Sequence, residues 1–170
     1  MRIVDFEPRH AGAWKALNES WITKLFRLEP KDVEVLDHPR ASILDRGGHI
    51  LIAEVDGEPV GCVALLSMAD GGFEVAKMTV GEAARGTGLG RRLMEACIAR
   101  ARALEAPRLY LETNSTLAPA LALYRSAGFV HLPPQPTPYS RADVWMELNL
   151  RAPATPDPRL PSTASCGSSD

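Results

Sequence analysis

The residues best suited to chemistry lie in one short loop, residues 85–90, with the sequence RGTGLG. Glycines let the backbone turn so that several N–H groups point to one place, and a helix that starts after the loop adds partial positive charge. Such a combination binds phosphate groups. Arg85 begins the loop, and Arg91 and Arg92 follow it, which strengthens the positive field. The glycines alone would also fit a plain tight turn between a strand and a helix.

Two common phosphate-binding loops do not fit the spacing. A Walker A loop needs Lys and Ser or Thr after its last glycine. Gly81 and Gly86 have the required gap, but Thr87 and Gly88 follow them. A dinucleotide-binding fingerprint needs GxGxxG after a first parallel strand, whereas Gly86, Gly88 and Gly90 are spaced GxGxG. Neither phosphoryl transfer nor a Rossmann dinucleotide site is therefore indicated.

The elements around the loop follow from hydrophobic periodicity. Residues 73–80 predict a strand before it, and Leu89, Leu93, Cys97 and Ala101 form one stripe of a helix after it. That helix ends before Pro107. Further along the chain the pattern predicts a strand over residues 108–113 and a helix over residues 117–127, with Gly128 as its C-cap.

The remaining segments complete one α+β domain over residues 1–150. Its other predicted elements are a strand over 2–6, helices over 11–28 and 31–36, a hairpin of strands 49–55 and 60–67, and final strands over 129–132 and 142–150. Residues 151–170 are rich in Pro and Ser and hold no aromatic residue. We expect a disordered tail there, since it buries too little apolar area to order itself.

Composition excludes several classes of function. The chain has 170 residues, 45% of them hydrophobic, and a net charge of −2. Residues 85–108 nevertheless carry six arginines and two glutamates. The net charge gives no global field to attract nucleic acid or an anionic membrane, and no apolar run is long enough to span a membrane. Three cysteines without CxxC spacing favour a reduced cytoplasm, and four scattered histidines predict no metal site.

The glycine loop resembles the pyrophosphate loop of the GNAT superfamily of acyl-CoA-dependent N-acetyltransferases, in the form Arg85-x-x-Gly88-x-Gly90. The resemblance extends to the strand before the loop, to residues 109–114 (LYLETN), and to residues 122–129 (ALYRSAGF). It implies a mixed, mostly antiparallel central sheet flanked by helices. It also implies a cofactor cleft where strands 73–80 and 108–113 splay apart.

The resemblance further implies acetyl-CoA as cosubstrate and assigns roles by motif position. Backbone groups of the strand would hold the pantetheine arm, loop amides the pyrophosphate, and Tyr124 would protonate the departing thiolate. The implied cofactor-binding residues are Met78, Thr79, Val80, Arg85, Gly86, Thr87, Gly88, Leu89, Gly90, Asn114 and Tyr124. A packed core aromatic is the alternative for Tyr124.

The reaction needs a neutral amine that attacks the thioester directly, with a base to remove its proton. Glu74 and Glu112 are the candidate bases, and solvated strand-face residues are the alternative for both. The family's substrate side implicates Trp21, Phe26, Glu29 and residues 133–139. Glu29 would attract a cationic amine, while Trp21 and Phe26 would otherwise be core residues.

These inferences predict an enzyme that moves an acetyl group from acetyl-CoA to a primary amine. A small-molecule amine is the first choice of acceptor. A protein lysine or N-terminal acetyltransferase and a noncatalytic acyl-CoA-binding module remain alternatives. We expect no nucleic-acid or membrane partner, and a homodimer fits the family.

Overall fold

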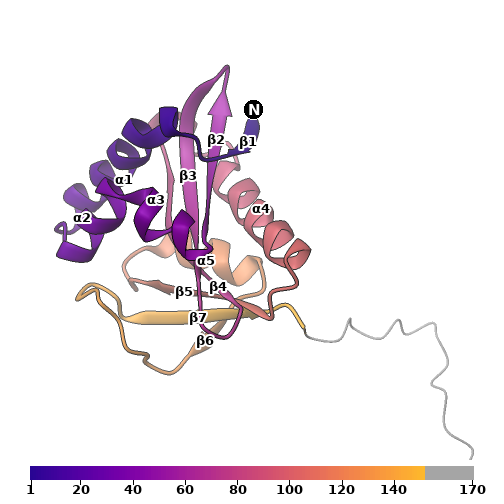
Figure 1. The fold of residues 1–170 in the computed structure, drawn as a ribbon. Helices are drawn as coiled ribbons and strands as arrows, with labels where there is room; N and C mark the ends of the chain where they lie inside the picture. The colour runs from indigo at the N-terminus through magenta and orange to yellow at the C-terminus, as the bar shows by residue number, and fades with distance from the viewer. Residues whose placement is uncertain (152–170) are drawn as a thin grey trace, which may run out of the picture.

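A seven-stranded sheet runs through the protein, in the strand order β1-β2-β3-β4-β5-β7-β6 (Figure 1). The structure is a computed structural model that describes residues 1–151, so nearly all of the predicted tail, Cys166 included, lies outside the described residues. The strands are β1 Arg2–Asp5, β2 His49–Val55, β3 Glu58–Ser67, β4 Phe73–Val80, β5 Arg108–Thr113, β6 Val130–Leu132 and β7 Val144–Asn149. Every pairing is antiparallel except that of β4 with β5, which confirms the predicted α+β fold class.

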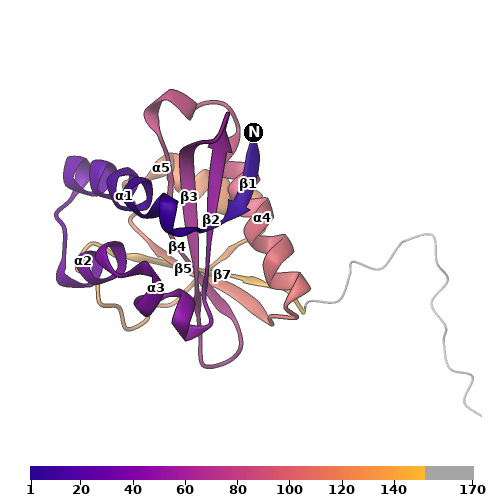
Figure 2. The same ribbon diagram turned by 45° about the horizontal axis from the view of Figure 1, so that its top comes forward.

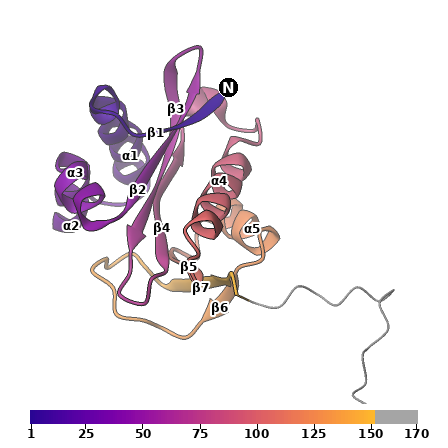
Figure 3. The ribbon, with the colours of Figure 1, turned by 45° about the vertical axis from the view of Figure 1, so that its right-hand side comes forward.

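Helices cover both faces of the sheet (Figure 3). One face carries α1 Ala11–Leu25, α2 Pro30–Asp37 and α3 Pro39–Ser42, and the other carries α4 Leu89–Ala103 and α5 Ala118–Ser126. Each face has its own core, centred on Trp14 and Ile52 beneath α1 and on Leu93 and Leu109 beneath α4. Over residues 1–151, every helix is too short or too polar to cross a bilayer.

The first helix ends earlier than its apolar stripe predicts. Phe26 leaves the helix with an extended backbone, and α2 begins at Pro30 after a capping box between Glu29 and Asp32. The apolar stripe is misleading here because Leu28 packs against the α1 core from the connecting loop. Short helical pieces at Pro8–His10, Pro39–Ser42, Leu44–Arg46 and Glu82–Ala84 were not predicted either.

Strands β4 and β5 separate soon after they begin. Only two residue pairs join them, Phe73 with Leu109 and Glu74 with Tyr110. Beyond Glu74 the β5 side of β4 has no partner strand, which gives the predicted splayed cleft. The segment from β4 to α4 arches over this end of the sheet, at the top of Figure 2.

A bulge in β4 changes the direction of its side chains. Phe73 and Val75 pack beneath α4, and strict alternation would put Lys77 beside them. Lys77 instead has a φ of 55°, and the register with β3 shifts at this point. Met78 then packs beneath α4, and Lys77 points to the α1–α2 face. The left-handed backbone costs about 1 kcal/mol, which the contacts of the Lys77 side chain must offset.

Candidate active site

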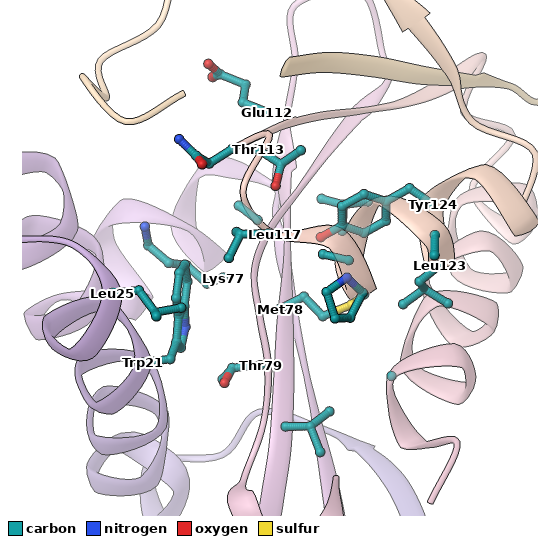
Figure 4. Close-up of a pocket in the computed structure, with 18 of the residues that line it drawn as sticks. Trp21, Leu25, Lys77, Met78, Thr79, Glu112, Thr113, Leu117, Leu123 and Tyr124 are labelled. Carbon is teal, nitrogen blue, oxygen red and sulfur yellow. The ribbon is translucent and has the colours of Figure 1, made fainter. Parts of the chain in front are cut away.

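The cleft between β4 and β5 has a volume of about 1170 Å³ and passes from one face of the sheet to the other. Figure 4 shows Trp21, Leu25 and Lys77 on the α1 side of β4, with Leu123 and Tyr124 on the α5 side. The opening left by the diverging strands thus connects two chemically different halves, here called the loop half and the acceptor half. The loop half contains residues 84–86, 88–91 and α5, and the acceptor half lies beside α1 and α2. Thr87, predicted with the loop, does not line the cleft, and its hydroxyl donates to the Ala84 carbonyl oxygen.

The glycine loop has a set of backbone amides without an acceptor among the described residues. Gly86 and Gly88 have φ values of 76° and 81°, and an added Cβ at either would meet nothing within 4 Å. The amides of residues 86–91 donate no hydrogen bond of normal geometry within residues 1–151. They lie at the start of α4, where the helix dipole adds positive charge. This backbone fits a phosphate-bearing ligand.

Arginine side chains divide between the cleft and the surface. Arg85 and Arg91 line the loop half, and Arg91 donates from Nη2 to Ser126 Oγ at 2.9 Å. Arg92, which the sequence placed with them, does not line the cleft. Arg100 pairs with Asp5, and Arg108 pairs with Asp70, both at 2.8 Å. Of the six arginines in residues 85–108, only Arg85 and Arg91 therefore line the cleft beside the glycine loop.

The predicted cofactor-binding strand and tyrosine meet in this cleft. Met78, Thr79 and Val80 line it from β4, and Tyr124 lines it from α5. Figure 4 shows the Tyr124 hydroxyl directed toward β4. Burial raises the pKa of Tyr124 to about 12, so the hydroxyl keeps its proton at neutral pH. Its ring also contacts Phe129, with centroids 6.1 Å apart, so the tyrosine has a packing role as well.

Asn114 lines the cleft, but its side chain already forms hydrogen bonds within the protein. Its Nδ2 donates to the Arg141 carbonyl oxygen at 2.7 Å, and its Oδ1 accepts from the Thr116 amide at 2.9 Å. The side chain therefore fixes the turn between β5 and α5 to the segment before β7. Any contact with a pantetheine arm would have to share these groups.

The carboxyl groups of Glu74 and Glu112 lie close together where β4 and β5 begin to separate. Glu74 stands opposite Tyr110 in the register, and Glu112 follows two residues later on the same face of β5. Burial and the neighbouring Glu112 carboxylate raise the pKa of Glu74 to about 7. Glu112 Oε2 is buried without a hydrogen-bond partner in the described part of the chain. Neither residue is the solvated carboxylate of the alternative interpretation.

The acceptor half is built around a buried aspartate that sequence reasoning missed. Asp32 is fully buried, and its Oδ1 accepts from Lys77 Nζ at 2.6 Å and from Arg141 Nη2 at 2.7 Å. Lys77 and Arg141 both lie 4.6 Å from the ring centre of Tyr139. The signal for Asp32 was its place three residues after Glu29, typical of a capping box, but no local pattern indicates its two cationic partners.

The structure bears on three expectations for the substrate side. Glu29 is not available to a cationic amine, because its carboxylate pairs with Arg141 at 3.0 Å and accepts from the Ser140 amide. Trp21 and Phe26 line the cleft in an edge-to-face contact and belong to neither buried core. Of residues 133–139, only Tyr139 lines the cleft.

A mixed sheet that opens between two parallel strands, with unpaired amides where one of them leads into a helix, is the architecture that the resemblance to the GNAT superfamily implied. The chain belongs to the acetyltransferase (GNAT) family, whose model matches residues 13–129.

The individual proteins that this chain resembles are also named as acetyltransferases. An IAA acetyltransferase of Azospirillum brasilense is 44% identical over 80 residues, which are 46% of this chain and 52% of that protein. The chain thus spans about half the length of the curated relatives it matches. A GNAT-family acetyltransferase of Staphylococcus aureus Mu50 has the same fold, with a TM-score of 0.80 at 18% identity over 88% of this chain and 99% of that one. So does yncA of Salmonella typhimurium, solved with its cofactor acetyl-CoA, with a TM-score of 0.69 at 20% identity over 93% and 98%.

Proposed function

We propose that this protein transfers an acetyl group from acetyl-CoA to a primary amine of a small molecule by direct attack. One observation carries the proposal: a single cleft connects the free amides of residues 86–91, the Tyr124 hydroxyl and the Glu74 carboxyl. The names of the relatives support the reaction class, and the yncA complex supports acetyl-CoA as the acyl donor.

The residues of the loop half fit acetyl-CoA as the acyl donor. Acetyl-CoA supplies the acetyl group as a reactive thioester. The amides of residues 86–91 and the guanidinium groups of Arg85 and Arg91 would hold its pyrophosphate. The exposed edge of β4 at Met78, Thr79 and Val80 would align the pantetheine arm, since these residues have no partner strand on that side.

Glu74 is the better of the two candidate bases. A base works best when its pKa lies near the working pH, and the pKa of Glu74 is raised to about 7. The Glu112 carboxylate keeps that pKa high, because two neighbouring carboxylates do not readily ionise together. We assign proton removal from the attacking amine to Glu74, and assign Glu112 the role of positioning and tuning it.

Tyr124 would return a proton to the leaving sulfur. Its hydroxyl forms no hydrogen bond with the described residues, points toward β4 and is protonated at neutral pH. No covalent intermediate with the protein is needed, and both free cysteines of residues 1–151, Cys62 and Cys97, are buried. Burial raises the pKa of each thiol to about 12, so neither is a ready nucleophile.

The acceptor half favours a small molecule over a protein chain. Tyr139 and Arg141 cover it from the segment before β7, and Arg141 is fastened to Glu29 and Asp32 on the other side of the cleft. A polypeptide substrate would need this cover to open.

A thiol-release assay with acetyl-CoA and a panel of small amines and peptides tests the proposal. We expect CoA release with small primary amines and little with peptides. Release only with peptides would assign a protein acceptor. Tight binding of acetyl-CoA without turnover on any amine would identify a noncatalytic binding module and contradict the proposal.

A further inference from the structure

Arg141 keeps one edge of its guanidinium group unpaired. An arginine has five N–H donors, and three of them are used here. Nη1 donates to Glu29 and Asp32, at 3.0 and 2.8 Å, and Nη2 donates to Asp32 at 2.7 Å. Nε–H and the second N–H of Nη2 have no partner within residues 1–151. These two donors are parallel and form a fork on one edge of the group.

The fork is held rigidly at the wall of the cleft. Asp32 fixes the adjacent Nη1–Nη2 edge of the guanidinium group, and the Tyr139 ring lies against its face at 4.6 Å. The Phe26 ring lies further away at 6.0 Å. The Arg141 side chain is 14% exposed and lines the cleft. Binding to the fork therefore requires little loss of side-chain entropy.

Within the Arg141 network the charges are balanced before any substrate enters, and the Glu74 and Glu112 carboxyl groups lie outside this network. Lys77 and Arg141 supply two positive charges, and Asp32 and Glu29 supply two negative charges. A group bound by the fork must satisfy its geometry without adding much charge beside those carboxylates. A monoanionic carboxylate meets both conditions, because its two oxygens match the fork, whereas a phosphate dianion would be repelled by Asp32 and Glu29.

We infer that the acceptor is an amino acid or a similar small amine with a carboxylate, which the Nε–H and Nη2–H fork of Arg141 binds while the amine lies at Glu74. This inference rests on the proposed function and adds a substrate class to it. Trp21, Phe26 and Tyr139 provide aromatic walls for an apolar side chain. Arg141 is then a residue that determines specificity.

Paired ligands test the carboxylate directly. The probes are L-phenylalanine, 3-aminopropanoate and 4-aminobutanoate, each beside its primary carboxamide, which keeps the amine and removes the negative charge. Calorimetry on the protein saturated with CoA measures affinity without turnover, and thiol release with acetyl-CoA measures kcat/KM. We expect at least one acid to bind and react at least tenfold better than its carboxamide. Equal values within every pair would overturn the inference.

The variant Arg141→Lys keeps the charge but removes the fork. We expect it to lower affinity and kcat/KM for the preferred acid at least tenfold more than for its carboxamide, so that the preference disappears. A purely structural role would lower both ligands of a pair in parallel, which would contradict the inference. Arg108→Lys is the matched control, because Arg108 also pairs with two carboxylates, Asp70 and Glu147, away from the cleft.

The two proposals fail differently. Turnover of amines without any preference for acids contradicts the carboxylate site and leaves the acetyltransferase reaction intact. Acid-selective binding without turnover contradicts the proposed reaction and supports the carboxylate site.

Discussion

Lys77 on β4 and Asp32 on α2 form a buried ion pair, with 2.6 Å between Nζ and Oδ1. The bulge in β4 creates this pair, because regular alternation would have directed Lys77 beneath α4 instead. Burial lowers the pKa of Lys77, and the Asp32 carboxylate acts against that lowering. The same carboxylate holds Arg141, so Asp32 joins α2, β4 and the segment before β7 around the acceptor half.

Asp32→Asn should destabilise the protein strongly, because it leaves the buried Lys77 without its counterion and leaves Arg141 with Glu29 alone. We expect the free energy of unfolding to fall by about 3 kcal/mol in urea denaturation at pH 7. Glu34→Gln on the same helix removes only the exposed pair with Lys31 and should cost about 0.3 kcal/mol. Equal effects of the two variants would show that Asp32 does not organise this region.

Acid should remove the contribution of Asp32. Burial alone would raise its pKa, but hydrogen bonds from Arg141 and Lys77 outweigh burial and hold the pKa at about 2. In an unfolded chain the pKa of an aspartate is about 3.9. The stabilisation is therefore complete above about pH 4 and is lost as the pH falls toward 2. Urea denaturation between pH 5 and pH 2.5 should show a smaller loss for Asp32→Asn than for the wild type.

The reaction should require deprotonated Glu74. We expect kcat/KM to rise as the pH passes about 7, where Glu74 loses its proton. Glu112→Gln removes the neighbouring negative charge, so the pKa of Glu74 falls and the rise should move to lower pH. Glu95→Gln, on the exposed side of α4, should leave the profile unchanged. An unmoved midpoint in Glu112→Gln would separate Glu112 from the site.

Gly88→Ala should weaken binding of acetyl-CoA at least tenfold in calorimetry. The added Cβ has open space, so the effect comes from the φ of 81°, which alanine adopts with strain. Relief of that strain would turn the loop amides away from the cleft. Gly57→Ala is the matched control, since Gly57 has a φ of 80°, open space and a place in the distant β2–β3 turn. It should cost stability and leave affinity unchanged.

Tyr124→Phe should lower kcat by about 100-fold and keep the affinity for acetyl-CoA, because the hydroxyl is assigned only to proton transfer. Stopped assays for kcat and calorimetry for affinity separate the two effects. Tyr110→Phe, on β5 and outside the cleft lining, provides the control. Unchanged turnover in Tyr124→Phe would leave Tyr124 with only its packing against Phe129.

Local patterns in the sequence determined most of the architecture. The period of apolar residues located the main strands and helices, because one face of each element must be buried. The glycines of residues 85–90 indicated the loop, because Gly86 and Gly88 adopt a backbone that other residues avoid. The order of these elements supported the family, which the comparison confirmed.

Only the tertiary structure decided how the acceptor half is built. Nothing near Lys77 in the sequence shows that β4 bulges there, since the cost of the bulge is offset by a contact with a residue 45 positions away. Arg141 meets Asp32 across 109 positions, and Glu74 acquires its raised pKa from burial and from a carboxylate on another strand. The sequence by itself determined the elements and the glycine loop, because both follow from interactions between near neighbours. The charged contacts of the acceptor half depend on long-range packing, which only the folded chain brings together.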